Sequence, residues 1–151
     1  MEATDKRTAT ADPVSIQDMS KISGLSEATL RYYERIGLIA PVPRDVSSGH
    51  RRYSGPAVEM IEALSCLRAT GMSVRDMRSY LLLMDEGDDS APRMRRLFED
   101  NVKRIDQEIE RMTIRRRYLT LKADLWAARE RGDAQAERRA VEELESVRGQ
   151  L

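Results

Sequence analysis

Residues 26–38, SEATLRYYERIGL, combine basic, aromatic and turn-forming side chains in a pattern that suits contact with nucleic acid. Ser26 is a favourable helix N-cap, and Glu27 suits the positive end of the helix dipole. The basic and aromatic candidates within the next two turns are Arg31, Tyr32, Tyr33 and Arg35. Gly37 favours the end of this helix, because glycine is common just past the last turn. Guanidinium and phenol groups on one short helix suit a phosphate backbone with base edges nearby.

Residues 15–23 just upstream predict a second short helix. Ser15 and Asp18 have the spacing of a capping box, in which the serine side chain accepts a bond from the first helical turn. Gly24 lies between the two predicted helices. A helix, a glycine turn and a helix with a basic face together predict a helix-turn-helix.

The segment that follows, residues 40–53, predicts a β-hairpin. Pro41 and Pro43 disfavour helix, and the run Ser-Ser-Gly at 47–49 is typical of a turn. Short extended arms on either side form the wing of a winged helix, and basic side chains on both arms can reach phosphates: Arg44, His50, Arg51 and Arg52. The alternative is a solvated basic loop without a partner.

Three motifs closely resemble those of MerR-type transcription regulators. Residues 29–38, TLRYYERIGL, resemble the family signature; residues 49–53, GHRRY, resemble its wing; residues 69–73, ATGMS, resemble its joint between the third and fourth helices. They occur in the family order with similar gaps, and with the long helix after them they cover about residues 14–128. The resemblance implies a winged helix-turn-helix head on an antiparallel coiled-coil dimer. It also implies a promoter with an overlong spacer, which is bent and untwisted so that polymerase reads both promoter elements.

Two helices are predicted between the wing and the acidic stretch 85–89. Ser54 can cap the first, with Pro56 in its first turn. Its apolar stripe is Val58, Ile61, Leu64 and Leu67. Ser73 and Asp76 repeat the capping pattern and open the second helix.

A heptad pattern begins after residue 90 and predicts one helix of about 35 residues. Ser90 is its expected N-cap, and Arg116 interrupts the apolar positions. The predicted dimer seam consists of Phe98, Val102, Ile105, Ile109, Met112, Leu119 and Trp126. The alternative is a long helix packed on its own domain, which is too small to cover that length. Beyond Gly132, residues 133–151 predict a short helix that either packs on the coiled coil or frays.

Several classes of protein are disfavoured by composition. The one cysteine excludes an intrachain disulfide and favours a reducing, cytoplasmic location. No signal peptide is visible, and the longest apolar run, 81–84, is too short to span a membrane. The single histidine and single cysteine disfavour a metal site, and no catalytic group or glycine-rich phosphate loop is recognisable. We therefore expect no enzyme activity, no cofactor and no metal.

Cys66 is a candidate sensor thiol. Its flanks, residues 62–71, resemble the third helix of the MerR-type regulators that respond to aldehydes or other thiol-reactive compounds, and residues 85–88 also resemble that branch. On a helical wheel Cys66 lies away from the apolar stripe but near Glu62, which disfavours a thiolate. An inert small side chain is the equal alternative.

The expected fold is all-α with a small β-hairpin wing, in which a winged helix-turn-helix head precedes a long coiled-coil dimerisation helix. The expected parts are a disordered tail at 1–13, the head at 14–86, the dimerisation helix at 90–130 and the short helix at 133–151. The candidate DNA-binding residues are Ser15, Ser26, Thr29, Arg31, Tyr32, Tyr33, Arg35, Arg44, His50, Arg51, Arg52, Tyr53 and Ser73.

The expected function is sequence-specific regulation of transcription by a homodimer that binds double-stranded promoter DNA, with RNA polymerase as its partner and Cys66 as the candidate switch. One alternative is a DNA-architectural or excision-type winged-helix protein that bends DNA without a promoter role. Another is a coiled-coil scaffold whose head binds protein. Footprinting on a specific operator and transcription from an overlong-spacer promoter distinguish these functions.

Overall fold

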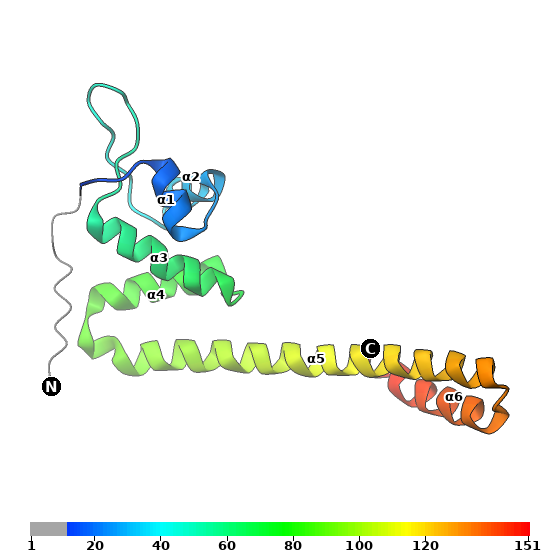
Figure 1. Ribbon diagram of the computed structural model, residues 1–151. Coiled ribbons are helices and arrows are strands. Elements are labelled where there is room, and N and C mark those ends of the chain that lie inside the picture. Colours follow the sequence, from blue (N-terminus) through cyan, green and yellow to red (C-terminus); the bar gives the residue numbers. More distant parts are fainter. Residues whose placement is uncertain (1–11) are drawn as a thin grey trace, which may run out of the picture. The chain divides into compact units, whose positions relative to one another are not determined.

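The computed structural model describes residues 12–151, and they are mostly helical (Figure 1). The predicted tail at 1–13 lies almost wholly outside the described residues. The elements in chain order are α1 (Ile16–Ser23), α2 (Glu27–Arg35), α3 (Gly55–Ala69), α4 (Val74–Glu86), the short 3₁₀ helix η1 (Asp88–Ser90), α5 (Ala91–Arg131) and α6 (Ala134–Arg148). The chain divides into two compact units, one ending at Met94 and the other running from Arg95 to Leu151. None of the helices within residues 12–151 is long and apolar enough to cross a membrane.

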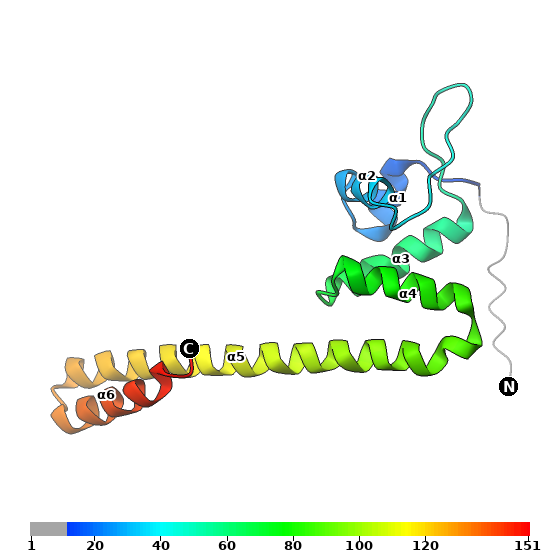
Figure 2. The ribbon, with the colours of Figure 1, turned by 180° about the vertical axis from the view of Figure 1, so that it is seen from behind.

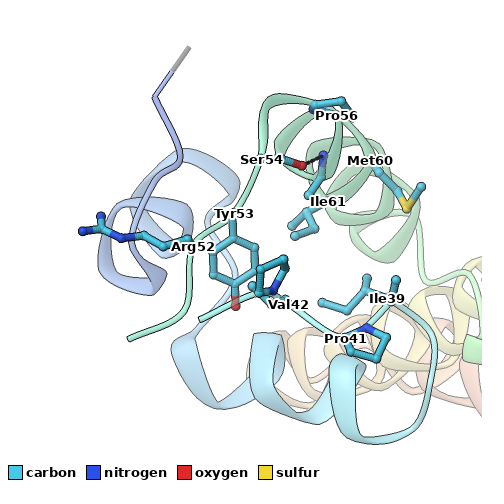
Figure 3. A pocket seen from close by; sticks show the side chains of 12 residues that line it. Ile39, Pro41, Val42, Arg52, Tyr53, Ser54, Pro56, Met60 and Ile61 are labelled. Carbon is cyan, nitrogen blue, oxygen red and sulfur yellow. Dashed lines mark hydrogen bonds between the residues drawn. The ribbon is translucent and has the colours of Figure 1, made fainter. Parts of the chain in front are cut away.

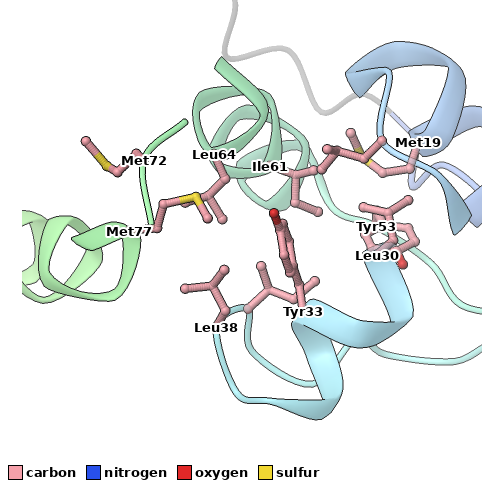
Figure 4. Packing of buried hydrophobic residues seen from close by; sticks show 11 residues of the cluster. Met19, Leu30, Tyr33, Leu38, Tyr53, Ile61, Leu64, Met72 and Met77 are labelled. Carbon is pink, nitrogen blue, oxygen red and sulfur yellow. The ribbon is translucent and has the colours of Figure 1, made fainter. Parts of the chain in front are cut away.

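The first unit has one apolar core, to which α1, α2, α3 and α4 all contribute (Figure 4). Its fully buried side chains include Met19 of α1, Leu30 of α2 and Ile61 and Leu64 of α3. Met77 of α4 is also buried, at 1 % exposure. Burying one such side chain stabilises the fold by about 1.5–3 kcal/mol. The core therefore fixes α2 against α1 and α3, and this arrangement decides which face of α2 remains in solvent.

Serine side chains begin each of the first four helices, as the sequence predicts. The Ser15 hydroxyl accepts a 3.1 Å hydrogen bond from the Asp18 amide at the start of α1, and Ser26 accepts one of 3.0 Å from Thr29 at the start of α2. Ser54 and Ser73 cap α3 and α4 in the same way. Each hydroxyl satisfies a backbone amide that has no acceptor within its own helix.

Two glycines end the first two helices with left-handed backbone. Gly24 has φ 73° and donates its amide to the Ser20 carbonyl, which closes α1. Gly37 has φ 71° just beyond the last turn of α2. Both predicted helix ends are confirmed, because the left-handed region is nearly free of strain only for glycine.

The predicted β-hairpin is not confirmed, since residues 12–151 contain no strand. We call residues 40–53, which extend away from α1, α2 and α3 as a long loop in Figure 1, the wing segment. Its two arms are joined by one isolated antiparallel bridge, Arg44 with Arg51, and its base is joined to Val14 through Tyr53. Pro41 and Pro43 lack an amide hydrogen, so the first arm cannot supply a continuous ladder of donors.

The second unit is a helical hairpin. α6 folds back along the end of α5, as both Figure 1 and Figure 2 show. Its apolar contacts are Leu121 and Leu125 of α5 with Ala140, Leu144 and Val147 of α6. The sequence left open whether this short helix packs or frays, and in the structure α6 packs on α5.

The start of α5 differs from the prediction. Ser90 does not cap this helix: its hydroxyl donates to the carbonyls of Leu83 and Gly87, both at 2.7 Å, and is buried. α5 then runs for 41 residues, which is longer than the stretch of about 35 residues expected from the heptad pattern but close to the expected bounds of 90–130.

Candidate nucleic-acid interface

The exposed face of α2 is basic and aromatic. Arg31, Tyr32 and Arg35 are exposed, whereas Leu30 and Tyr33 are buried in the core. At 100° per residue, Arg31, Tyr32 and Arg35 lie on the side of the helix opposite the two buried side chains. The structure therefore brings three of the predicted site residues together on one surface.

Contacts on this face hold its side chains near one another. The Arg35 guanidinium lies over the Tyr32 ring, 5.5 Å from its centroid. Arg31 lies 4.0 Å from the Glu27 carboxylate, one turn earlier. Such exposed contacts contribute little to stability but limit the positions of the guanidinium groups.

Thr29 begins the same helix and is half-buried. Its hydroxyl accepts a 2.8 Å hydrogen bond from the Ser26 hydroxyl, so both side chains belong to the N-cap. Ser15 and Ser73 are caps as well. The structure thus explains these serines by helix capping, and a DNA contact by any of them remains a prediction.

Tyr33 does not belong to the exposed face, which corrects the expectation that its side chain is available to DNA. Its side chain is only 3 % exposed and packs with the core cluster shown in Figure 4. Burial raises the pKa of its hydroxyl, against the opposing effect of Arg68. The physical reason is its spacing, because Tyr33 lies three residues after the buried Leu30 and shares that side of the helix.

Tyr53 is also a core residue, contrary to expectation. Its exposed fraction is 0 %, and its ring lies between the wing segment and α3, beside Val42 and Ile61 in Figure 3. Its hydroxyl is buried without a hydrogen-bond partner among the residues that the structure describes. Burial also raises the pKa of this hydroxyl. Tyr53 therefore anchors the base of the wing segment and does not reach its surface.

Exposed basic side chains remain along the wing segment: Arg44, His50 and Arg52. The Arg44 guanidinium donates a 3.2 Å hydrogen bond to the Gly49 carbonyl across the turn. The turn itself is closed by Asp45, whose carboxylate accepts bonds from the hydroxyl and amide groups of Ser47 and Ser48. The Ser47 hydroxyl and the two backbone amides hold the pKa of Asp45 well below its usual value.

Arg51, another of the candidate DNA-binding residues, has a partner within the protein. Its Nε donates a 2.7 Å hydrogen bond to Oε2 of Glu34 on α2, and the two side chains are 18 % and 17 % exposed. Glu34 was not among the site residues predicted from the sequence. The signal in the sequence was the negative charge of Glu34. A carboxylate on a helix predicted to meet phosphates needs a cationic partner within the protein.

The other candidate residues lie outside this surface. Cys66 is exposed on α3, as its position off the apolar stripe predicts. The predicted seam residues of α5 are mostly exposed in the single chain, with Val102, Ile109, Met112, Leu119 and Trp126 all above 50 %. The Arg129 guanidinium lies over the Trp126 ring, 4.9 Å from its centroid. Within residues 12–151 no group of three or more His, Cys, Asp or Glu side chains is arranged to hold a metal ion.

Comparison with known proteins places the chain among transcription regulators. Residues 14–83 match the family described as MerR HTH family regulatory protein. The transcriptional regulator AdhR of Bacillus subtilis is 38 % identical over 92 residues, which are 61 % of this chain and 65 % of AdhR. The regulator HmrR of Rhizobium leguminosarum is 34 % identical over 106 residues, 70 % of this chain and 81 % of HmrR. The chain thus spans slightly less than two thirds of AdhR, and a larger share of HmrR.

Solved structures are similar as well. A putative MerR family regulator from Listeria monocytogenes is 29 % identical with a TM-score of 0.61, over 91 % of this chain and 98 % of that one. HiNmlR, described as a MerR family regulator lacking the sensor domain and bound to promoter DNA, is also 29 % identical with a TM-score of 0.61, over 82 % and 94 % of the two chains. These relatives are named as regulators of transcription rather than as enzymes. The chain therefore belongs to the MerR family of DNA-binding, helix-turn-helix transcription regulators.

Proposed function

We propose that this protein binds promoter DNA as a homodimer, with α2 in the major groove and the wing segment against the adjacent backbone. The observation that carries the proposal is the exposed face of α2, where Arg31, Tyr32 and Arg35 lie opposite the core. A short helix that ends a helix-turn-helix and exposes guanidinium groups suits base edges and phosphates together. Arg44, His50 and Arg52 add flanking contacts from the wing segment.

Homodimer formation is supported by the apolar side chains that α5 leaves in solvent. Ile109 is 58 % exposed and Met112 61 %, and they continue a heptad pattern along the helix. A contiguous apolar surface of this kind is unusual on a monomer and typical of an interaction site. A second α5 covers it by coiled-coil packing. A dimer with two-fold symmetry then presents two α2 helices to a pseudo-palindromic operator.

We further propose that the bound dimer bends and untwists an overlong promoter spacer so that RNA polymerase contacts both promoter elements. Deforming the spacer costs free energy, and contacts from two heads to the backbone offset that cost. Modification of the exposed Cys66 on α3 is the proposed switch between a repressing and an activating form. The description of HiNmlR as bound to promoter DNA supports the first step only, since it states no bend and no thiol chemistry.

Footprinting on the DNA that flanks the coding sequence tests operator binding. We expect protection of an inverted repeat, and Arg31→Ala should weaken that binding. Because each phosphate contact releases counterions, Arg31→Ala should also make the dependence of log K on log salt less steep, by about 0.9 for each head of the dimer that loses its contact. Arg139→Ala, which removes the same charge from exposed α6, is the matched control and should leave the slope unchanged.

The promoter role is tested separately by transcription in vitro. A template with an overlong spacer should respond to the protein, whereas a template with a spacer of ordinary length should not be activated. A protein that bends DNA without regulating a promoter gives a footprint and leaves transcription from both templates unchanged. A scaffold whose head binds protein gives no footprint at all.

A further inference from the structure

We propose that Glu34 is the positioning residue of the wing segment: its one carboxylate holds both arms of that segment against α2, and so sets where the wing meets DNA. This inference rests on the proposed function for its effect on DNA. Glu34 itself contacts no nucleic acid in the proposal, and it acts through Arg51 and Val42.

The two carboxylate oxygens of Glu34 contact different arms. Oε2 accepts the 2.7 Å hydrogen bond from Arg51 Nε, on the arm that returns to α3. Oε1 accepts a 3.1 Å hydrogen bond from the backbone amide of Val42, on the arm that leaves α2. A single side chain therefore ties the recognition helix to both halves of the wing segment.

The wing segment has few other bonds that could orient it. Its arms are joined by the Asp45 amide to the His50 carbonyl and by the Arg52 amide to the Pro43 carbonyl, both at 2.8 Å. These bonds, and those around Asp45, hold the two arms to each other but do not attach them to α2. Tyr53 anchors only the end of the second arm. Among the hydrogen bonds described, the contacts of Glu34 are the ones that join α2 to the first arm and to Arg51.

The charge of Glu34 fits an internal role. Burial raises its pKa, but the hydrogen bonds from Arg51 and from the Val42 amide outweigh burial and hold the pKa below its usual value. The carboxylate is therefore ionised at neutral pH, on a helix that is proposed to approach phosphates. An ionised carboxylate there repels the phosphates and so opposes DNA binding. Its hydrogen bonds to the wing segment favour DNA binding and compensate for this repulsion.

Neutralising Glu34 tests the proposal by the sign of its effect. If only charge matters, Glu34→Gln removes a negative group and strengthens operator binding. If positioning matters, Glu34→Gln weakens binding, because the amide cannot replace a charge-assisted bond to Arg51. We expect operator affinity to fall about tenfold, which corresponds to the loss of about 1.4 kcal/mol. Glu59→Gln, the same change at an exposed position of α3, is the matched control and should leave operator affinity unchanged.

Amide hydrogen exchange of the protein without DNA supplies an independent measurement. In Glu34→Gln the amides of Val42, Asp45 and Arg52 should exchange faster, while the amides of α3 keep their wild-type rates. Arg51→Gln should give the same pattern, and the double variant should add little to either single one, since the two residues act as one unit.

Unchanged exchange of the wing amides, or operator binding by Glu34→Gln that equals or exceeds wild type, overturns the proposal. Faster exchange throughout α3 in Glu34→Gln also overturns it, because the carboxylate then supports the whole fold rather than the wing segment. If the wild type binds no operator, the proposed function fails instead, and the exchange rates still decide whether Glu34 orders the wing segment.

Discussion

The hydroxyl of Ser65, on α3, donates a 2.6 Å hydrogen bond to the backbone carbonyl of Ser23, the last residue of α1. The carbonyls of the last helical turn receive no hydrogen bond from an amide of their own helix. A buried carbonyl there therefore needs a donor from another part of the protein. Ser23 in turn donates its own hydroxyl to the Met19 carbonyl. Ser65 therefore fastens the turn of the helix-turn-helix to α3, 42 residues further along the chain.

Ser65→Ala should destabilise the first unit, because it leaves the Ser23 carbonyl half-buried without its donor. We expect the free energy of unfolding to fall by about 1–2 kcal/mol. Urea denaturation should show a lower midpoint with an unchanged slope. Ser79→Ala is the matched control, since Ser79 donates only to the Arg75 carbonyl within its own helix and alanine is a better helix former. Equal losses for the two variants would contradict the role given to Ser65.

Tyr53→Phe should be neutral or stabilising, because it removes a buried hydroxyl that has no hydrogen-bond partner among the described residues. An unsatisfied buried polar group costs about 1–3 kcal/mol, and the ring that fills the core is retained. Thermal unfolding and operator binding measure the two expected outcomes: a melting temperature equal to or above wild type, and an unchanged affinity. Loss of affinity without loss of stability would return Tyr53 to the DNA-binding surface.

The sequence predicted those parts of the fold that depend on residues close together in the chain. A serine three residues before a helical amide and a glycine after the last turn are local patterns, and the caps at Ser15, Ser26, Ser54 and Ser73 appear as expected. Residues far apart were predicted less well. The Glu34–Arg51 pair spans 17 residues and the Ser65–Ser23 contact spans 42, and no spacing rule connects them.

The errors at the candidate site have the same origin. Tyr33 and Tyr53 were selected because phenol groups beside arginines suit contact with DNA, but a phenol ring suits an apolar core equally well. For Tyr33 the sequence held a usable signal, since it lies one turn after Leu30 on the buried side of α2. For Tyr53 it held none, because that ring is buried in a core to which helices distant along the chain contribute.

Ile109→Asp should dissociate the proposed homodimer, because it places a charge in the centre of the apolar seam. Sedimentation at micromolar concentration should change from dimer to monomer, and operator affinity should fall with it, since one head covers only half a site. Gln107→Asp introduces the same charge two residues away, on the opposite side of α5, and should remain dimeric. A wild type that sediments as a monomer would exclude the seam as a dimer interface.

Cys66→Ser should abolish any transcriptional response to electrophiles while leaving operator binding intact. The thiol is exposed on α3, so a reagent can reach it without unfolding the core. An adduct changes the protein only by its difference in free energy between the repressing and activating forms, so labelling alone is not sufficient evidence. The measurement is transcription from the overlong-spacer promoter with and without an aldehyde. A second variant, Cys66→Ser with Glu62→Cys, moves the thiol one turn along the exposed side of α3 and should be labelled without restoring the response. If Cys66→Ser responds like the wild type, the thiol is an inert side chain and the inducer acts elsewhere.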